Sequence, residues 1–190
     1  MAVKVIAGRA HGRRLRVPGG GGTRPTSGLV RGALFNMLAH RGWLDDARIL
    51  DCFAGSGALG IEALSRGARS AIFVESVPAA ARVLRSNVVA SGLAERSRVM
   101  TMPMTRAVRA LGREGVVVDG VLADPPYGEH LVQQLLDEIE RAGVLAEDGW
   151  IAVEHAADEP PVPGPGLALV ASRRHGRTTL SLLARATEDA

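Results

Sequence analysis

From residue 48 onward, the sequence alternates between short apolar runs and segments with helical periodicity. Apolar runs of this length are typical of buried strands, and the intervening segments are long enough to form α-helices. The alternation predicts an α/β fold in which a parallel sheet carries helices on both faces. The expected strands cover residues 48–53, 70–75, 97–102, 118–123 and 149–154, and the expected helices cover residues 58–66, 78–91, 104–112 and 129–142.

The pattern changes after Glu154. The proline-rich stretch DEPPVPGPG predicts a loop, and the segments LALVASRRH and RTTLSLLAR predict a hairpin that turns at Gly176. We therefore expect a Rossmann-like, doubly wound sheet that is mainly parallel and closes with a C-terminal antiparallel hairpin.

The N-terminal region differs from the rest in charge. Residues 1–44 contain eight Lys or Arg and no Asp or Glu, whereas residues 45–190 contain 15 basic and 20 acidic residues. Residues 2–7 and 13–17, joined by GRAHG, predict a small hairpin, and the GGGG stretch at 19–22 predicts a hinge before a helix near 27–40. Clustered positive charge is typical of proteins that bind nucleic acid, so we expect this hairpin to contact a polyanion.

A glycine-rich turn, LDCFAGSGALG, joins the first strand to its helix at residues 50–60. Gly55, Gly57 and Gly60 match the G-x-G-x-x-G pattern, which lets the backbone approach a ligand at a helix N-terminus. Glu75 ends the next strand, where an acid binds ribose hydroxyl groups. A dinucleotide would use the same residues, but Asp51 at the strand end favours a ligand with a cationic end. S-adenosylmethionine has an ammonium, a sulfonium and a ribose, and it matches this distribution of charge.

The segment VLADPPYGEH contains a rigid corner. Pro125 and Pro126 have fixed φ angles and no N–H group, and Asp124 is extended because a proline follows it. Asp124 and the Pro125 carbonyl are therefore fixed hydrogen-bond acceptors on the same sheet edge as Asp51 and Glu75, beside Tyr127, the single tyrosine of the chain. Acceptors on the two N–H groups of a planar amine favour the tetrahedral geometry that methyl transfer to nitrogen needs, and Tyr127 can stack on the base.

With these residues in place, the chain resembles a known family. Asp-Pro-Pro-Tyr at this position is the catalytic motif of class I amino-methyltransferases. The wider sequence is similar to bacterial RsmD-type enzymes, which methylate guanine N2 in 16S ribosomal RNA. The likeness extends over VIAGRAHGRRLRVP, RPTSGLVRGALFNML, LDCFAGSGALGIEALSRGA, FVE, DPPY and HGRTTLSLL. Departures from the family pattern stand at Gly28, Gly32 and His175.

The resemblance and the charge pattern together define the expected site. The resemblance implies that S-adenosylmethionine is held by Arg24, Pro25, Thr26, Asp51, Phe53, Ala54, Gly55, Ser56, Gly57, Glu75, Ser76 and Met104. The expected catalytic residues are Asp124, Pro125, Pro126 and Tyr127. The expected RNA contacts are Lys4, Arg9, His11, Arg13, Arg14 and Arg16.

We therefore expect residues 1–22 to form a basic, RNA-binding extension and residues 23–190 to form the methyltransferase domain. The expected partner is 16S rRNA, within the 30S subunit or an assembly intermediate. Two alternatives stay open: an adenine-N6 DNA methyltransferase and a non-catalytic RNA-binding assembly factor. The sequence contains one cysteine and no stretch typical of a signal peptide or a membrane span; we expect a cytoplasmic monomer that uses no metal.

Overall fold

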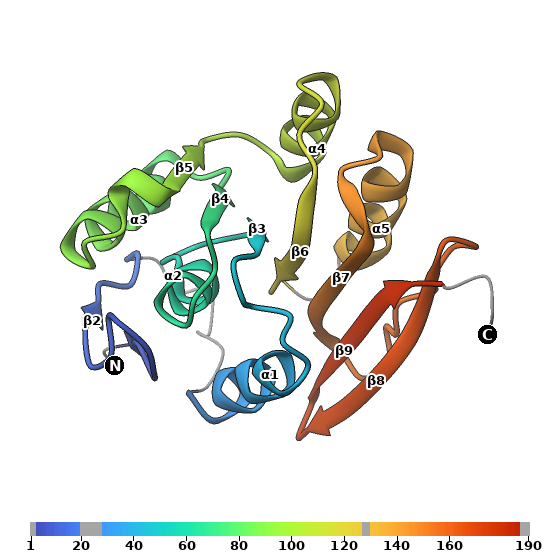
Figure 1. The fold of residues 1–190 in the computed structure, drawn as a ribbon, viewed down its shortest axis with the longest axis horizontal. Coiled ribbons are helices and arrows are strands. Elements are labelled where there is room, and N and C mark those ends of the chain that lie inside the picture. The colour runs from blue at the N-terminus through green and yellow to red at the C-terminus, as the bar shows by residue number, and fades with distance from the viewer. Residues whose placement is uncertain (1–2, 20–27, 127–129, 187–190) are drawn as a thin grey trace.

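The computed structural model describes residues 3–19, 28–126 and 130–186 of the chain. In this part, a seven-stranded sheet has the strand order β5-β4-β3-β6-β7-β9-β8 (Figure 1). Strands β3 to β7 pair in parallel, and β9 pairs antiparallel with both β7 and β8. This arrangement confirms the predicted fold class, a class I methyltransferase sheet with a C-terminal antiparallel hairpin.

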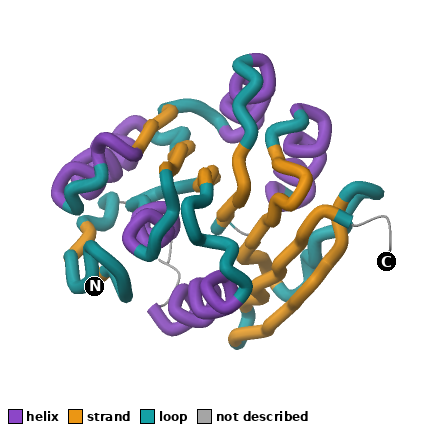
Figure 2. The backbone as a smooth tube through the Cα atoms, viewed as in Figure 1, coloured by secondary structure: helices purple, strands orange, loops and turns teal. Residues whose placement is uncertain are grey.

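The elements follow the predicted order, and helices and strands alternate along the middle of the tube in Figure 2, before the final three strands. The strands are β1 (Val3–Lys4), β2 (Arg14–Leu15), β3 (Arg48–Cys52), β4 (Ser70–Val74), β5 (Ser97–Met100), β6 (Val118–Ala123), β7 (Leu145–Ala156), β8 (Leu167–His175) and β9 (Thr178–Arg185). The helices are α1 (Gly28–His40), α2 (Ala58–Ser65), α3 (Pro78–Ala90), α4 (Met104–Arg113), α5 (Leu131–Ala142) and the short 3₁₀ helix η1 (Ala94–Arg96).

Two strands of the seven-stranded sheet differ from the prediction by more than one residue. β5 ends at Met100, two residues early, because the chain then turns toward Pro103 and α4. β7 begins at Leu145, before the expected residue 149, and its register with β6 shifts between Val118 and Gly120. Across this irregularity β7 contains three more residues than β6, and no alternation pattern in the sequence marks it.

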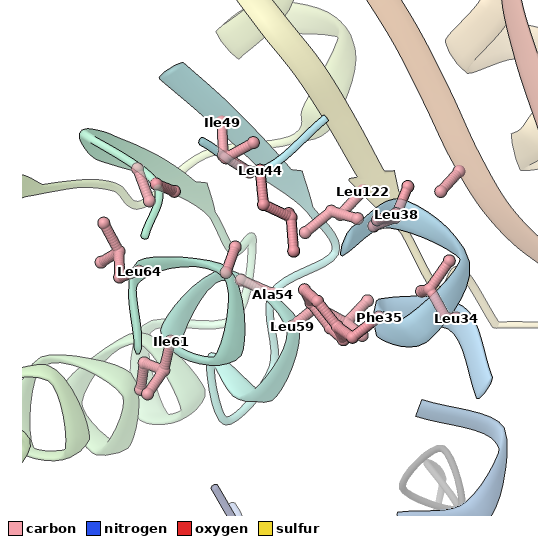
Figure 3. Close-up of a cluster of buried hydrophobic side chains, with 14 of the residues drawn as sticks. Leu34, Phe35, Leu38, Leu44, Ile49, Ala54, Leu59, Ile61, Leu64 and Leu122 are labelled. Carbon is pink, nitrogen blue, oxygen red and sulfur yellow. The ribbon is translucent and has the colours of Figure 1, made fainter. Parts of the chain in front are cut away.

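Two apolar clusters lie on opposite faces of the sheet. On one face, Leu34, Phe35 and Leu38 of α1 pack near Leu59 of α2 and Leu122 of β6 (Figure 3). On the other face, α4 and α5 bury their apolar sides against β3, β6 and β7. Because α1 is fixed to the sheet in this way, its first turn has a set position relative to the carboxyl ends of the strands.

The N-terminal hairpin is attached to the sheet domain through its backbone. The fully buried Glu62 carboxylate of α2 accepts hydrogen bonds from the N–H groups of Ile6 (2.7 Å) and Ala7 (3.0 Å). Because these N–H groups bond to a side chain, β1 and β2 pair over only two residues each, which is shorter than the predicted strands. Val5 and Leu15 of the hairpin join the same core as α1. The hairpin therefore has a fixed place on the domain.

Candidate active site

The strands β3, β4 and β6 end side by side, and a cavity of about 450 Å³ lies at this carboxyl edge. Ligand sites in open α/β sheets lie at this edge, and the volume is within the range of small-molecule sites. Eight of the predicted cofactor residues line the cavity: Asp51, Phe53, Ala54, Gly55, Ser56, Glu75, Ser76 and Met104. Arg24, Pro25 and Thr26 lie outside the described residues.

The turn between β3 and α2 has an unusual backbone. Gly55 and Gly57 have φ angles of 54° and 80°, which favour glycine, and Phe53 has a φ of 63° although it carries a side chain. Non-glycine residues in this region are uncommon and are concentrated at functional sites. Gly57 does not line the cavity, and a Cβ atom at its position would lie 2.4 Å from Leu84.

Gly60 has a different role from the one that we expect above for all three glycines, and it is the packing role typical of the third glycine in this motif. Its N–H group donates a 2.8 Å hydrogen bond to Asp51 Oδ2, and a Cβ atom there would lie 2.3 Å from the Phe73 ring. We expected the three glycines to bring the backbone close to a ligand. Instead, the third glycine packs the helix against the sheet and orients the Asp51 carboxylate.

The Asp51 carboxylate is buried at the cavity, with 1% of its surface exposed. Its Oδ1 atom has no hydrogen-bond partner among the described residues. Burial raises the pKa of Asp51 to about 7, the Gly60 hydrogen bond opposes this rise, and the charges of Asp124 and Glu75 add to it. A buried carboxylate oxygen without a partner costs free energy, so the site suits a ligand that brings a positive charge and an N–H donor.

Glu75 lies across the glycine turn from Asp51 and is also buried. Its Oε2 atom accepts a 2.9 Å hydrogen bond from the Gly55 N–H group, and its Oε1 atom accepts a 2.8 Å hydrogen bond from the Val77 N–H group. Each carboxylate oxygen can accept a second hydrogen bond. The carboxylate is thus fixed by the backbone and retains capacity for ligand hydroxyl groups.

The corner after β6 completes this edge. Asp124 is partly buried, Pro125 is buried and Pro126 is exposed, and Asp124 and Pro126 both line the cavity. Tyr127 lies outside the described residues. The structure therefore brings the Asp51, Glu75 and Asp124 carboxyl groups to one cavity from the ends of three parallel strands.

Sequence reasoning missed several cavity residues, and Arg31 is the most informative. This arginine of α1 is 3% exposed and lines the cavity. One guanidinium nitrogen donates to the Lys4 carbonyl at 2.5 Å, and Nε has no hydrogen-bond partner among the described residues. Burial lowers its pKa, and the nearby Glu62 carboxylate opposes that shift. Helical periodicity could have predicted this burial. Arg31 stands three residues before the buried Leu34 and four before the buried Phe35, so all three share one face of α1. Val17, Pro18 and Gln134 also line the cavity.

The predicted RNA contacts are on the surface. Lys4, Arg9, His11, Arg13, Arg14 and Arg16 are all exposed. Within the described residues, none of them forms an ion pair with a carboxylate.

Asn87 of α3 connects this hairpin to the glycine turn. Its side-chain oxygen accepts from the Arg16 N–H group (2.9 Å), and its nitrogen donates to the carbonyl oxygens of Arg16 and Ser56 (both 2.8 Å). The Asn87 side chain is buried. One amide group thus fixes the base of the hairpin relative to the cavity wall.

Asn87→Ala should weaken both the fold and ligand binding at the cavity. The change removes a hydrogen-bond partner from three backbone groups, so we expect a loss of about 1–3 kcal/mol in the free energy of unfolding and a lower affinity for S-adenosylhomocysteine. Urea denaturation and calorimetric titration measure the two effects. Asn36→Ala, which alters an exposed asparagine of α1, is the matched control. Wild-type ligand affinity in a folded Asn87→Ala protein would contradict the connection.

The family described as "Conserved hypothetical protein 95" matches residues 3–184. The chain belongs to this family. It is 39% identical over 163 residues to the Escherichia coli K12 ribosomal RNA small subunit methyltransferase D, covering 85% of this chain and 79% of that protein. The Haemophilus influenzae protein of the same name is 31% identical over 175 residues, covering 92% of this chain and 89% of that one.

Solved structures of similar proteins agree with the fold. The Escherichia coli putative methyltransferase yhhF superposes with a TM-score of 0.83 at 35% identity, over 97% of this chain and 98% of that one. A hypothetical protein of Thermus thermophilus superposes with a TM-score of 0.80 at 32% identity, over 95% and 98% of the two chains. The predicted RsmD-type resemblance is confirmed, and the chain is a methyltransferase whose cofactor is S-adenosylmethionine.

The cavity fits this cofactor on its own chemistry, because Asp51 offers a buried, unpartnered oxygen to a cation and Glu75 is fixed at the next strand end. No group of three or more His, Cys, Asp or Glu residues in the described part of the chain is arranged to hold a metal ion. Likewise, none of the described helices is long and apolar enough to cross a membrane.

Cofactor affinity should rise with pH. Because burial raises the pKa of Asp51 to about 7, the carboxyl group is largely neutral under mildly acidic conditions and cannot pair with an ammonium. Ionisation restores that pairing, so we expect affinity to rise about tenfold between about pH 6 and about pH 8. Calorimetry with S-adenosylhomocysteine across this range measures the effect. A flat profile in the wild type, equal to that of Asp51→Asn, would contradict it.

Proposed function

We propose that this protein transfers the methyl group of S-adenosylmethionine to the exocyclic N2 of a guanine in 16S ribosomal RNA. The observation that carries the proposal is the convergence of three carboxyl groups on one cavity beside an exposed basic hairpin. The names of the Escherichia coli and Haemophilus influenzae relatives support a small-subunit RNA substrate.

In this proposal, the cofactor is held at both ends. Asp51 Oδ1 accepts from the ammonium of the methionine moiety, and Glu75 accepts from the ribose hydroxyl groups. Phe53, Ala54, Gly55, Ser56 and Gly57 shape the turn around the methionine moiety, Ser76 and Met104 contact the adenosine, and Arg24, Pro25 and Thr26 close over the ligand. When bound, S-adenosylmethionine supplies an electrophilic methyl group.

The corner after β6 acts on the nucleophile. Asp124 and the Pro125 carbonyl accept hydrogen bonds from the guanine amine, so that its lone pair points at the methyl carbon. Bound S-adenosylmethionine would supply the methyl group and leave as S-adenosylhomocysteine, while Asp124 and the Pro125 carbonyl would hold the amine as it releases its proton to solvent. Pro125 and Pro126 keep the acceptors rigid, and Tyr127 stacks on the base. Orientation and fixed acceptors therefore provide the rate enhancement.

The two parts of the chain have separate tasks in this proposal. Residues 1–22 bind RNA through Lys4, Arg9, His11, Arg13, Arg14 and Arg16, and residues 23–190 carry out methyl transfer. The protein works in the cytoplasm as a monomer, on 16S rRNA within the 30S subunit or an assembly intermediate.

Methylation of defined substrates tests the proposal. The purified protein is incubated with labelled cofactor and one of three substrates from cells that lack the enzyme: naked 16S rRNA, 30S particles or genomic DNA. Mapping the modified base should give N2-methylguanine in the RNA samples. A labelled methyl group on adenine N6 in DNA would support the alternative function of an adenine-N6 DNA methyltransferase. Cofactor binding without methyl transfer to any substrate would support a non-catalytic assembly factor.

Replacing Arg9, Arg13 and Arg14 together by Gln should weaken RNA binding and leave the affinity for the cofactor unchanged. Each lost phosphate contact lowers the slope of log affinity against log salt by about 0.7–0.9. These side chains are exposed, so the variant should fold, and filter binding to 16S rRNA across a salt series is the measurement. An unchanged slope would place the RNA on another surface.

A further inference from the structure

We propose that the turn of the β8–β9 hairpin is a second phosphate-binding surface for the RNA strand. This surface, here called the hairpin tip, comprises Arg173, Arg174, His175, Gly176 and Arg177. The inference rests on the proposed function, because it assumes that the substrate is RNA, and it adds a binding surface far along the chain from the basic N-terminal hairpin.

The sheet register places the hairpin tip on the edge that carries the active site. Ala156, at the end of β7, pairs with Thr178 at the start of β9, and His175 pairs with the same Thr178. Since β7 is parallel to β6, the tip lies at the carboxyl edge, near Asp124. Three strand spacings separate β6 from β8, which corresponds to a distance of about 15 Å. An RNA segment of a few nucleotides can span that distance.

The three arginine side chains of the tip, Arg173, Arg174 and Arg177, are exposed and form no ion pair within the described part of the chain. By contrast, two partly exposed arginines at the other end of the sheet are paired, Arg48 with Asp119 and Arg98 with Glu114. Moreover, residues 160–187 contain no Asp or Glu. The tip therefore presents guanidinium groups, which bind phosphate in a bidentate manner.

The turn is tight and holds one of these side chains. Because His175 pairs with Thr178, only two residues connect the strands, and Gly176 has the positive φ of 66° that such turns require. The Arg174 Nε–H group donates to the Gly176 carbonyl at 2.9 Å. Asp158 and Glu159 follow β7 closely, so the phosphate backbone should approach from the β8 side.

The two basic hairpins flank the site. In Figure 1, the N-terminal hairpin (blue) and the β8–β9 turn (red) lie on opposite sides of α1, whose Arg31 lines the cavity. RNA held at both hairpins would pass the carboxyl edge with the target base between its two contacts. Such an arrangement positions the nucleotide without sequence-specific contacts, since phosphate contacts set register and orientation.

The test compares two triple variants with equal loss of charge. The tip variant replaces Arg173, Arg174 and Arg177 by Gln, and the control variant replaces Arg69, Arg98 and Arg113, which lie toward the opposite edge of the sheet. We expect the tip variant to bind a 16S rRNA transcript more weakly, with a salt slope smaller by about 2. Its kcat/KM should fall mainly through KM, and its affinity for S-adenosylhomocysteine should equal that of the wild type. Replacing the same three residues by Lys should restore most of the binding.

The outcomes separate this inference from the proposed function. If the tip and control variants share the same RNA affinity and salt slope, the hairpin tip is an ordinary solvated turn and the inference fails alone. If the tip variant loses cofactor affinity as well, the tip acts through the fold and the inference also fails. If the wild-type protein itself neither binds nor methylates the transcript or the 30S particle, the proposed function and the inference fall together.

Discussion

Asp124→Ala should lower kcat by about a hundredfold or more while cofactor affinity stays near the wild-type value. Loss of one fixed transition-state acceptor typically has an effect of this size. Asp124 and Pro126 line the cavity after β6, and in the proposed mechanism the carboxylate acts on the amine. Single-turnover methylation of 30S particles gives the rate, and calorimetry gives the cofactor affinity.

A conservative replacement separates hydrogen bonding from charge at this position. Asp124→Asn retains one carbonyl acceptor, so it should keep more activity than Asp124→Ala. Removing the Asp124 carboxylate also removes a charge that helps to raise the pKa of Asp51, and cofactor binding should therefore become less dependent on pH. Near-normal turnover in Asp124→Ala would contradict the proposed role of Asp124 in orienting the guanine amine.

Asp51→Ala should reduce affinity for the cofactor by about 10- to 100-fold, the usual range for losing a hydrogen bond to a charged group. The mutation also leaves the Gly60 N–H group, which now donates to Asp51 Oδ2, without a partner. We therefore expect some loss of stability. Asp51→Asn is the better probe, because it can still accept from Gly60 but carries no charge.

The control for this prediction is Asp119→Asn, which neutralises a partly exposed aspartate paired with Arg48. Calorimetry with S-adenosylhomocysteine should show normal affinity for the control and weak binding for both Asp51 variants. Wild-type affinity in a folded Asp51→Asn protein would remove Asp51 from the proposed cofactor site.

Much of this site could be predicted because its residues stand at strand ends. Asp51, Glu75 and Asp124 each follow an apolar run, and the parallel alternation places such positions on one edge of the sheet. The glycine pattern located the turn for the same reason. The role of Gly60 was missed, because packing against Phe73 depends on the neighbouring strand β4.

Contacts between segments that are far apart in the chain could not be predicted from the sequence. Glu62 and Asn87 look like ordinary helical residues, yet they bond to backbone groups 55 or more positions away. The hairpin tip was missed for another reason. Residues 160–187 contain no Asp or Glu, but residues 45–190 as a whole have a negative net charge, which hides this basic stretch. Only the strand register shows that Arg173, Arg174 and Arg177 stand at the active-site edge.

The attachment of the N-terminal hairpin has a consequence for biosynthesis. The hairpin is synthesised before the sheet domain, and the Glu62 and Asn87 side chains that hold its backbone follow 55 to 71 residues later. Long-range contacts of this kind form late, since a long loop must close first. We therefore expect the hairpin to fold together with the glycine turn. A nascent chain should then have no folded RNA-binding hairpin before the glycine turn has formed.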